Sequence, residues 1–302
     1  MKKLITTLII AVALGAGLAM LVKSFPVNAR TLADFFSSDA RSVEVSDKLV
    51  SRTMADLAEF NAVSVSRNVQ VEYIVSKSRK VEISVGENVV DSLYCVVEDG
   101  VLKIGLKGNN ICYQKTSKRL NVKVYGPAAL TSVSVLTGAD FKANLIDGDK
   151  VKFSSSTSGE ISVTKVVAMR VDAEASTSGD IKIDAVDCSN SNFRASTSGD
   201  IKVGALKAVS LIADAQTSGD VKISVFDGND AELGASTSGD VKVKQLTVRK
   251  LKASASTSGD IDVSGTAGEA DFSASTSGDI VAKNLKTQNP KIRKATGGSV
   301  KM

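Results

Sequence analysis

One repeated sequence motif, called the repeat phrase below, constrains the fold of this chain more than any other feature. Ser-Thr-Ser-Gly followed by Asp or Glu, or a close variant, recurs at a constant period of roughly 20 residues, and the last step is one residue shorter. Weaker echoes occur at Thr137-Gly138 and at Thr296-Gly297-Gly298. A fixed period of this length indicates units that stack on one another. The repeat glycines are Gly159, Gly179, Gly199, Gly219, Gly239, Gly259 and Gly278.

Each unit alternates apolar and polar residues, which is the period of a β-strand with one buried face. After Gly179, for example, Ile181 and Ile183 alternate with charged residues, and Phe193 and Ala195 follow. A unit of this length is too short for a strand-helix-strand crossover. We therefore predict an all-β fold, a right-handed parallel β-helix (solenoid) whose coils of ~20 residues lie about 4.8 Å apart. The shortened unit should lose its residue between Gly259 and Ala270, where Gly265 and Gly268 mark a turn that can absorb the loss.

The sequence before the repeat divides into three further segments. Lys2 and Lys3 precede the apolar run 4–22, and Val27-Asn28-Ala29 resembles a signal-peptidase site. Residues 1–29 are therefore interpreted as a signal peptide, or as an uncleaved membrane anchor, because an apolar run of this length can also span a bilayer. Residues 30–59 form a tether, residues 60–140 an irregular β region that caps the solenoid, and residues 141–302 the regular coils. Within the cap, Glu98-Asp99-Gly100 predicts a hairpin turn.

Export sets the expected compartment and the redox state of the cysteines. We expect the periplasm or the cell surface of a Gram-negative bacterium, or attachment to the inner membrane facing the periplasm. In an oxidising compartment Cys95 and Cys112 could pair, or could be small buried hydrophobic residues, and Cys188 would be left over.

Composition excludes several function classes. The chain has no His, which removes Ser-His-Asp and Cys-His nucleophile pairs and H-E-x-x-H zinc sites. A net charge of +5 over 302 residues, with 4% aromatic residues, is too dilute for a nucleic-acid platform. Catalysis by carboxylates or lysines stays open.

Stacked coils should place like residues in columns. The acidic residue after each glycine would form one column, in which neighbouring carboxylates repel each other by roughly 1 kcal/mol in water. Lysines two residues further along would form a parallel basic column and offset that repulsion. A row of calcium ions is the alternative, although the β-roll calcium nonapeptide is missing; we expect no other cofactor. The candidate binding residues are Asp180, Asp200, Asp220, Asp240, Asp260, Asp279, Lys182, Lys202, Lys222 and Lys242, with Glu160 before them.

The phrase itself is interpreted as a sharp turn between strands. We expect Gly179 and its equivalents to take positive φ, which glycine adopts without a Cβ clash. Strand parity then places Thr177 and its equivalents inside, and Ser176 and Ser178 outside. Ice or mineral binding needs outward threonines, so this parity argues against it.

Several segments in order resemble the bacterial "putative auto-transporter adhesin, head GIN domain" family of Bacteroidetes. They include Phe60-Asn61-Ala62-Val63, Val97-Glu98-Asp99-Gly100, the Ser-Thr-Ser-Gly-Asp units and Thr296-Gly297-Gly298-Ser299-Val300. The resemblance implies an exported β-helical protein at the surface or in the periplasm, and it carries over no catalytic residues. Because coils fill the sequence to Met302, we expect no translocator domain after them.

Three functions compete at this point. The first is a non-enzymatic, adhesin-like scaffold that presents Asp, Lys and Ser to a protein, a glycan or other copies of itself. The second is a polysaccharide-processing enzyme using carboxylates, which would need two acids in a pocket; the third is ice binding. We expect self-association, if it occurs, at the C-terminal end of the solenoid, where backbone groups are unpaired. No nucleic-acid partner is expected, and a membrane contact only through an uncleaved N-terminus.

Overall fold

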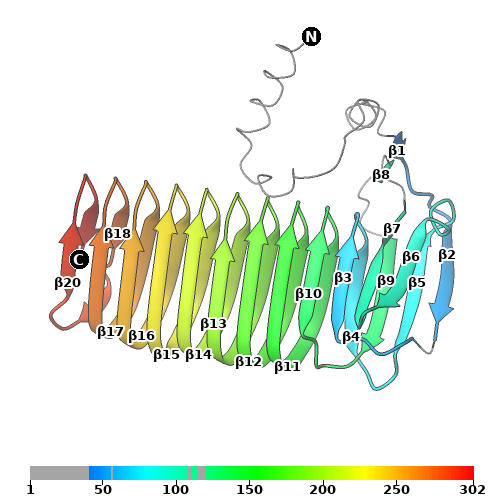
Figure 1. The fold of residues 1–302 in the computed structure, drawn as a ribbon, viewed down its shortest axis with the longest axis horizontal. Coiled ribbons are helices and arrows are strands. Elements are labelled where there is room, and N and C mark those ends of the chain that lie inside the picture. Colours follow the sequence, from blue (N-terminus) through cyan, green and yellow to red (C-terminus); the bar gives the residue numbers. More distant parts are fainter. Residues whose placement is uncertain (1–40, 56, 108–110, 114–119) are drawn as a thin grey trace, which may run out of the picture. The chain divides into compact units, whose positions relative to one another are not determined.

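Parallel strands stacked in one column form the repeat region (Figure 1). The computed structural model describes residues 41–55, 57–107, 111–113 and 120–302. Each repeat unit supplies one strand of 15 to 17 residues that pairs in parallel with the units before and after it. The predicted parallel β-solenoid, with one repeat unit per coil, is confirmed. The long strands are β11 (Asp140–Ser156), β12 (Glu160–Ser176), β13 (Asp180–Ala195), β14 (Asp200–Gln216), β15 (Asp220–Ser236), β16 (Asp240–Ala255) and β17 (Asp260–Ala274).

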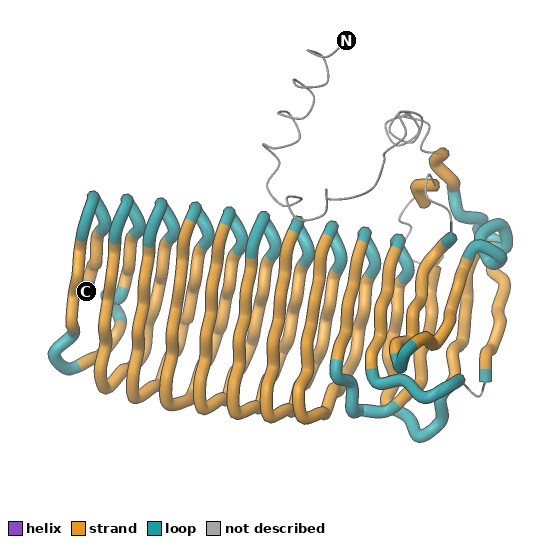
Figure 2. The backbone as a smooth tube through the Cα atoms, in the orientation of Figure 1, coloured by secondary structure: helices purple, strands orange, loops and turns teal. Residues whose placement is uncertain are grey.

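The long strands bend twice, and in β11 to β16 the buried positions change parity at both bends. In β13 the buried residues Ile181 and Ile183 are two apart, but the next, Val186, comes three positions later. The same three-position step separates Cys188 from Ser191. A coil therefore has three straight sides joined by two corners, and a sharp turn leads to the next coil. Figure 2 shows these sharp turns aligned along one edge.

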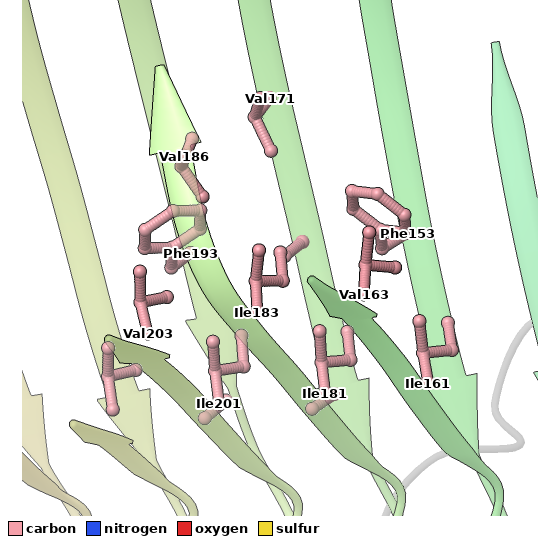
Figure 3. Close-up of a cluster of buried hydrophobic side chains, with 14 of the residues drawn as sticks. Phe153, Ile161, Val163, Val171, Ile181, Ile183, Val186, Phe193, Ile201 and Val203 are labelled. Carbon is pink, nitrogen blue, oxygen red and sulfur yellow. The ribbon is translucent and has the colours of Figure 1, made fainter. Parts of the chain in front are cut away.

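Large and small side chains alternate along one column of the core. Register places phenylalanine or leucine of one coil against alanine of the next, so large rings fill the space above small residues. Figure 3 shows Phe153 and Phe193 inside this core with the isoleucines and valines of the first side. All members of the column are buried: Phe153, Ala173, Phe193, Ala213, Leu233, Ala253 and Phe272.

The shortened unit loses its residue at the first corner, within the predicted segment. Val243 pairs with Val263, but Leu246 pairs with Gly265, so the register shifts by one position there. Gly265 has φ +126°, a conformation that residues with a Cβ rarely adopt.

Parallel stacking begins before the regular repeats. β3 (Ala62–Ser66) pairs in parallel with β10 (Ser132–Leu136), and β4 (Gln70–Val75) pairs in parallel with β11. Antiparallel strands continue the sheet beyond this first coil, since β5 pairs with β2 and β9, and β6 pairs with β7. The predicted hairpin at Asp99-Gly100 joins β6 to β7, and Asp99 as well as Gly100 has positive φ. These strands are β2 (Leu49–Met54), β5 (Lys80–Gly86), β6 (Leu93–Glu98), β7 (Val101–Leu106) and β9 (Leu120–Gly126).

Short strands complete the last coil. β21 lies on β18, while β19 and β20 lie on β17. Ile292 in β20 is exposed at this end. In the part of the chain that the structure describes, no helix is long and apolar enough to cross a membrane. The short strands are β18 (Asp279–Val281), β19 (Leu285–Thr287), β20 (Lys291–Lys294) and β21 (Ser299–Lys301); β1 (Arg41–Val43) and β8 (Ile111–Tyr113) form a separate two-stranded sheet. The proposed signal or anchor segment lies outside the described residues.

The cysteines whose side chains are described are free and buried. Burial raises the pKa of Cys95 to about 11 and that of Cys188 to about 12, so both thiols stay protonated near neutral pH. In this structure Cys95 is a free, buried thiol, in agreement with one of the two interpretations. The side chain of Cys112 lies outside the described residues.

Candidate functional site

The first straight side of each coil carries the predicted charged residues outward, and we call this surface the column face. It consists of the residues one, three and five places after each repeat glycine, such as Asp180, Lys182 and Asp184. Because the strands pair in exact coil-to-coil register, each of these positions stacks into a column along the solenoid.

The acidic column is continuous over the whole repeat region. Register pairs each member directly with the next, with one backbone step of about 4.8 Å between coils. The column extends one coil further than predicted, since Asp140 stands opposite Glu160 and is almost fully buried. Its members are Asp140, Glu160, Asp180, Asp200, Asp220, Asp240, Asp260 and Asp279.

The basic column stands beside the acidic column over four coils. Lys182, Lys202, Lys222 and Lys242 are in register, with Ser162 before them and Asp262 after them. The four lysines line a shallow groove of about 280 Å³. The next outward column, Asp184, Gly204, Ser224 and Lys244, also lines that groove, with its two smallest residues in the middle.

The two columns are electrostatically coupled. The Nζ atom of Lys202 lies 3.1 Å from Asp200, and that of Lys222 lies 2.6 Å from Asp220. The hydrogen bond to Asp220 raises the pKa of Lys222, and the carboxylates of the neighbouring coils add to this effect. Each of these lysines thus offsets repulsion within the acidic column, as the sequence predicts.

Repulsion remains at Asp240. Its carboxyl is partly removed from water, which raises its pKa; the neighbouring Asp220 carboxylate raises it further. A raised folded-state pKa for an acid means that ionisation weakens the fold at neutral pH, and that this cost disappears once the group is protonated in both states.

Asp240→Asn should therefore stabilise the protein slightly at pH 7, by about a few tenths of a kcal/mol. The asparagine can keep the oxygen that accepts the Asp260 amide hydrogen. Urea midpoints at pH 7 and pH 3 should show the gain only at pH 7. Asp279→Asn is the matched control of opposite sign, because hydrogen bonds from Ser299 and then Lys301 lower the pKa of Asp279. This variant should lose stability at pH 7, with a smaller loss at pH 3. A gain in stability for both variants would contradict the conclusion that the charge of Asp240 is unfavourable and that of Asp279 favourable.

The turn itself differs from the prediction in two ways. Positive φ belongs to the threonine and second serine of each phrase, for example 50° at Thr177 and 61° at Ser178, and not to Gly179. Thr177 and Ser178 are both exposed, so the threonines point outward instead of inward. Strand parity failed because the chain leaves the strand at Ser176, whose carbonyl accepts the Gly179 amide hydrogen and closes a two-residue turn.

Hydrogen bonds between coils hold this strained turn. The amide of Ser178 donates to the carbonyl of Thr197 in the next coil at 3.1 Å, and the same bond recurs along the row. The exposed hydroxyl ridge consists of Thr157, Thr177, Thr197, Thr217, Thr237, Thr257 and Thr276, each followed by an exposed serine. The parity objection to ice binding is therefore removed, but the ridge is only one turn wide at the edge of the solenoid (Figure 2).

Glycine is required at the repeat positions because there is no room for a Cβ atom. A Cβ at Gly179 would overlap backbone atoms of Ser155 and Ser156 in the preceding coil. The glycines are buried while their neighbours in the turn are exposed. Close approach of two turns, not positive φ, explains why glycine stands there.

Two further features bear on metal binding and on catalysis. Within the described ranges, no group of three or more Cys, Asp or Glu could hold a metal ion. A second groove of about 670 Å³ on the third side of the last coils contains several acids, the feature that an enzyme would need. Three of its four carboxylates, Asp230, Glu232 and Asp271, lie within ion-pair distance of Arg249, Lys252 and Arg293, respectively, and the fourth is Glu269.

Comparison with known proteins supports both the fold and the family resemblance. The family model "Putative auto-transporter adhesin, head GIN domain" matches residues 59–227 and 223–302. A search of curated proteins found no match.

Solved structures from Bacteroidetes share the fold. A putative adhesin from Parabacteroides distasonis is 21% identical, with 86% of this chain and 99% of that chain covered, at a TM-score of 0.57. A structure titled "Putative lipid binding protein" from the same species is 16% identical, with 86% of this chain and 99% of that chain covered, at a TM-score of 0.61. A putative adhesin from Bacteroides fragilis is 16% identical, with the same coverage of both chains, at a TM-score of 0.50. At these identities the likeness concerns the fold.

Proposed function

Since the chain belongs to the "putative auto-transporter adhesin, head GIN domain" family, we propose that it is an exported, non-enzymatic scaffold with adhesin-like function. The columns of Asp and Lys on the column face and the Thr-Ser ridge are its contact surfaces. The carrying observation is that chemically identical side chains stand in register over successive coils. Such an array gives many equal weak contacts, whose joint strength grows with the number engaged.

The groove of the last coils favours this role over catalysis. A glycosidase needs one carboxylic acid that can donate a proton and a second that acts as base or nucleophile. Three of the four acids in the groove, Asp230, Glu232 and Asp271, instead face basic side chains of neighbouring coils, at 3.8 Å, 2.5 Å and 2.7 Å, respectively. Within the described part of the chain, only Glu269 of these four has no such ion pair, and a pair of acids needs two. These pairs are typical of a surface that joins successive coils.

Export follows from the sequence of residues 1–29. A basic start, an apolar run and a small-residue site direct a chain out of the cytoplasm. We propose a location in the periplasm or at the cell surface, where an extended array can meet another molecule or another cell.

The test is a binding screen with residues 30–302, which contain the complete compact unit Ser42–Met302. Fluorescently labelled protein is applied to glycan arrays, matrix proteins and lipid vesicles, with and without calcium, and a thermal-hysteresis assay covers ice. We expect saturable binding to a protein or glycan. The variant Lys202→Glu/Lys222→Glu should weaken that binding at least tenfold. The matched control Lys165→Glu/Lys207→Glu makes the same charge change away from the column face and should bind normally.

Three outcomes would contradict the proposal. Binding to none of the surfaces would remove the adhesin-like role. Equal binding by the column-face variant and the control would move the contact away from the two columns. Turnover of a polysaccharide by the wild-type protein, lost on Asp271→Asn, would favour the enzyme.

A further inference from the structure

The charge pattern of the column face is complementary to itself. Over four coils an acidic column (Asp180, Asp200, Asp220, Asp240) stands beside a basic column (Lys182, Lys202, Lys222, Lys242). Residues two apart in a strand lie roughly 7 Å apart, and coils about 4.8 Å apart. The surface is therefore a pair of narrow parallel stripes of opposite sign and equal charge number.

Two copies can bring these stripes together in one favourable way. If a two-fold axis parallel to the solenoid and midway between the columns relates the second copy to the first, the two faces meet. Its acidic column then lies on the basic column of the first, and its basic column on the acidic one. A two-fold axis across the coils would instead place acid on acid and lysine on lysine. Complementarity thus selects a side-by-side pair with both solenoids running in the same direction.

The balance of charge favours a second copy over other charged partners. An anionic polymer bound to the lysines would be repelled by the acidic column, which lies only roughly 7 Å away. A cationic partner bound to the aspartates would be repelled by the lysines in the same way. The lysine side chains are about half exposed, at 52% for Lys202 and 45% for Lys222, so they can reach a partner. In the middle two coils the adjacent column holds only the small residues Gly204 and Ser224, so no bulky side chain beside Lys202 and Lys222 holds two faces apart; the larger residues Asp184 and Lys244 stand at the two ends of the groove.

We propose that this protein self-associates through the column face as a parallel, side-by-side pair. This inference names a second copy of the chain as one partner of the column face. It rests on the proposed function only because both use the same columns of Asp and Lys. The four coils cover roughly a few hundred Å² on each copy, which is small for a stable interface. The pair should therefore be weak, reversible and sensitive to salt.

A charge-swap experiment on residues 30–302 tests the pair. One variant carries Lys182→Glu, Lys202→Glu, Lys222→Glu and Lys242→Glu; the other carries Asp180→Lys, Asp200→Lys, Asp220→Lys and Asp240→Lys. Sedimentation velocity should show the wild type with twice the monomer mass at low salt and as a monomer in 1 M NaCl. Each variant alone should be monomeric, because both of its columns have one sign. An equimolar mixture should restore the doubled mass as a mixed pair.

A control variant separates this effect from net charge. Lys150→Glu, Lys165→Glu, Lys207→Glu and Lys250→Glu change the charge equally on other exposed surfaces and should leave the pair intact. Circular dichroism checks that every variant keeps its β spectrum; if a fourfold variant unfolds, the twofold versions at the 200 and 220 coils replace it.

Carbodiimide cross-linking of mixed ¹⁴N- and ¹⁵N-labelled protein tests the orientation. Parallel pairing predicts intermolecular links between lysines and aspartates of the same coil, such as Lys222 with Asp220. A wild type that stays monomeric at low salt, a mixture that does not associate, or single variants that still pair would overturn the inference. Sedimentation uses no ligand, and the binding screen can be run at protein concentrations far below those of the sedimentation experiment, where a weak pair dissociates. A failure of self-association is therefore distinguishable from a failure of adhesion.

Discussion

Phe193→Ala should lower the free energy of unfolding by roughly 3–5 kcal/mol, a large part of what an ordinary domain has. Phe193 is fully buried, and its neighbours in the core column are Ala173 and Ala213. Neither alanine can reach into the vacated space, since both are held by strand pairing on either side. The cavity should persist, which is the condition for a cost at the upper end of the range. Urea unfolding followed by circular dichroism measures the change.

Phe193→Leu is the matched control. Leu233 occupies the same column position two coils later, between Ala213 and Ala253, so leucine is compatible with this geometry. The leucine variant should therefore lose clearly less than the alanine variant. Equal losses would mean that the large-small alternation does not govern packing here.

The periodic parts of this fold could be predicted because their causes are local. Ile181 and Ile183 reveal a strand by their spacing, and the constant distance between glycines sets the register of the coils. The charged columns follow from that register without further information, as Asp200 opposite Asp220 shows. The shortened coil could also be located, because Gly265 lies in the unit that lacks a residue.

The turn and the cap could not be predicted for different physical reasons. Alternation identifies inward residues only while the chain stays extended. Because the chain leaves the strand at Ser176, parity predicts Thr177 on the inside although it is exposed. Nothing local distinguishes a glycine needed for positive φ from one needed for close approach; the atoms that crowd Gly179 lie in another coil. The antiparallel pairing of β2 with β5 joins segments that are far apart in the chain and carry no repeat.

Gly219→Ala tests this interpretation of the turn and should destabilise the protein by roughly 3 kcal/mol, at the upper end for overpacking. An added Cβ would lie 2.6 Å from the Ser196 nitrogen and 2.7 Å from the Ala195 carbonyl carbon. Both are backbone atoms of the preceding coil, so no side chain can rotate away. Because coils stabilise each other through their interfaces, the turn cannot shift without loosening its neighbours. Thermal and urea unfolding measure the loss.

Ser218→Gly in the same turn separates the two explanations for glycine. Ser218 has φ 62°, a conformation that costs a residue with a Cβ about 1–2 kcal/mol, whereas glycine adds about 0.5–1 kcal/mol of backbone entropy cost. The substitution should therefore be neutral or stabilise by up to about 1 kcal/mol. If positive φ were the reason for the repeat glycines, Gly219→Ala would cost no more than the left-handed penalty. A loss below about 2 kcal/mol at Gly219 would contradict close packing of the turns, whereas a loss of about 3 kcal/mol beside a neutral Ser218→Gly would support it.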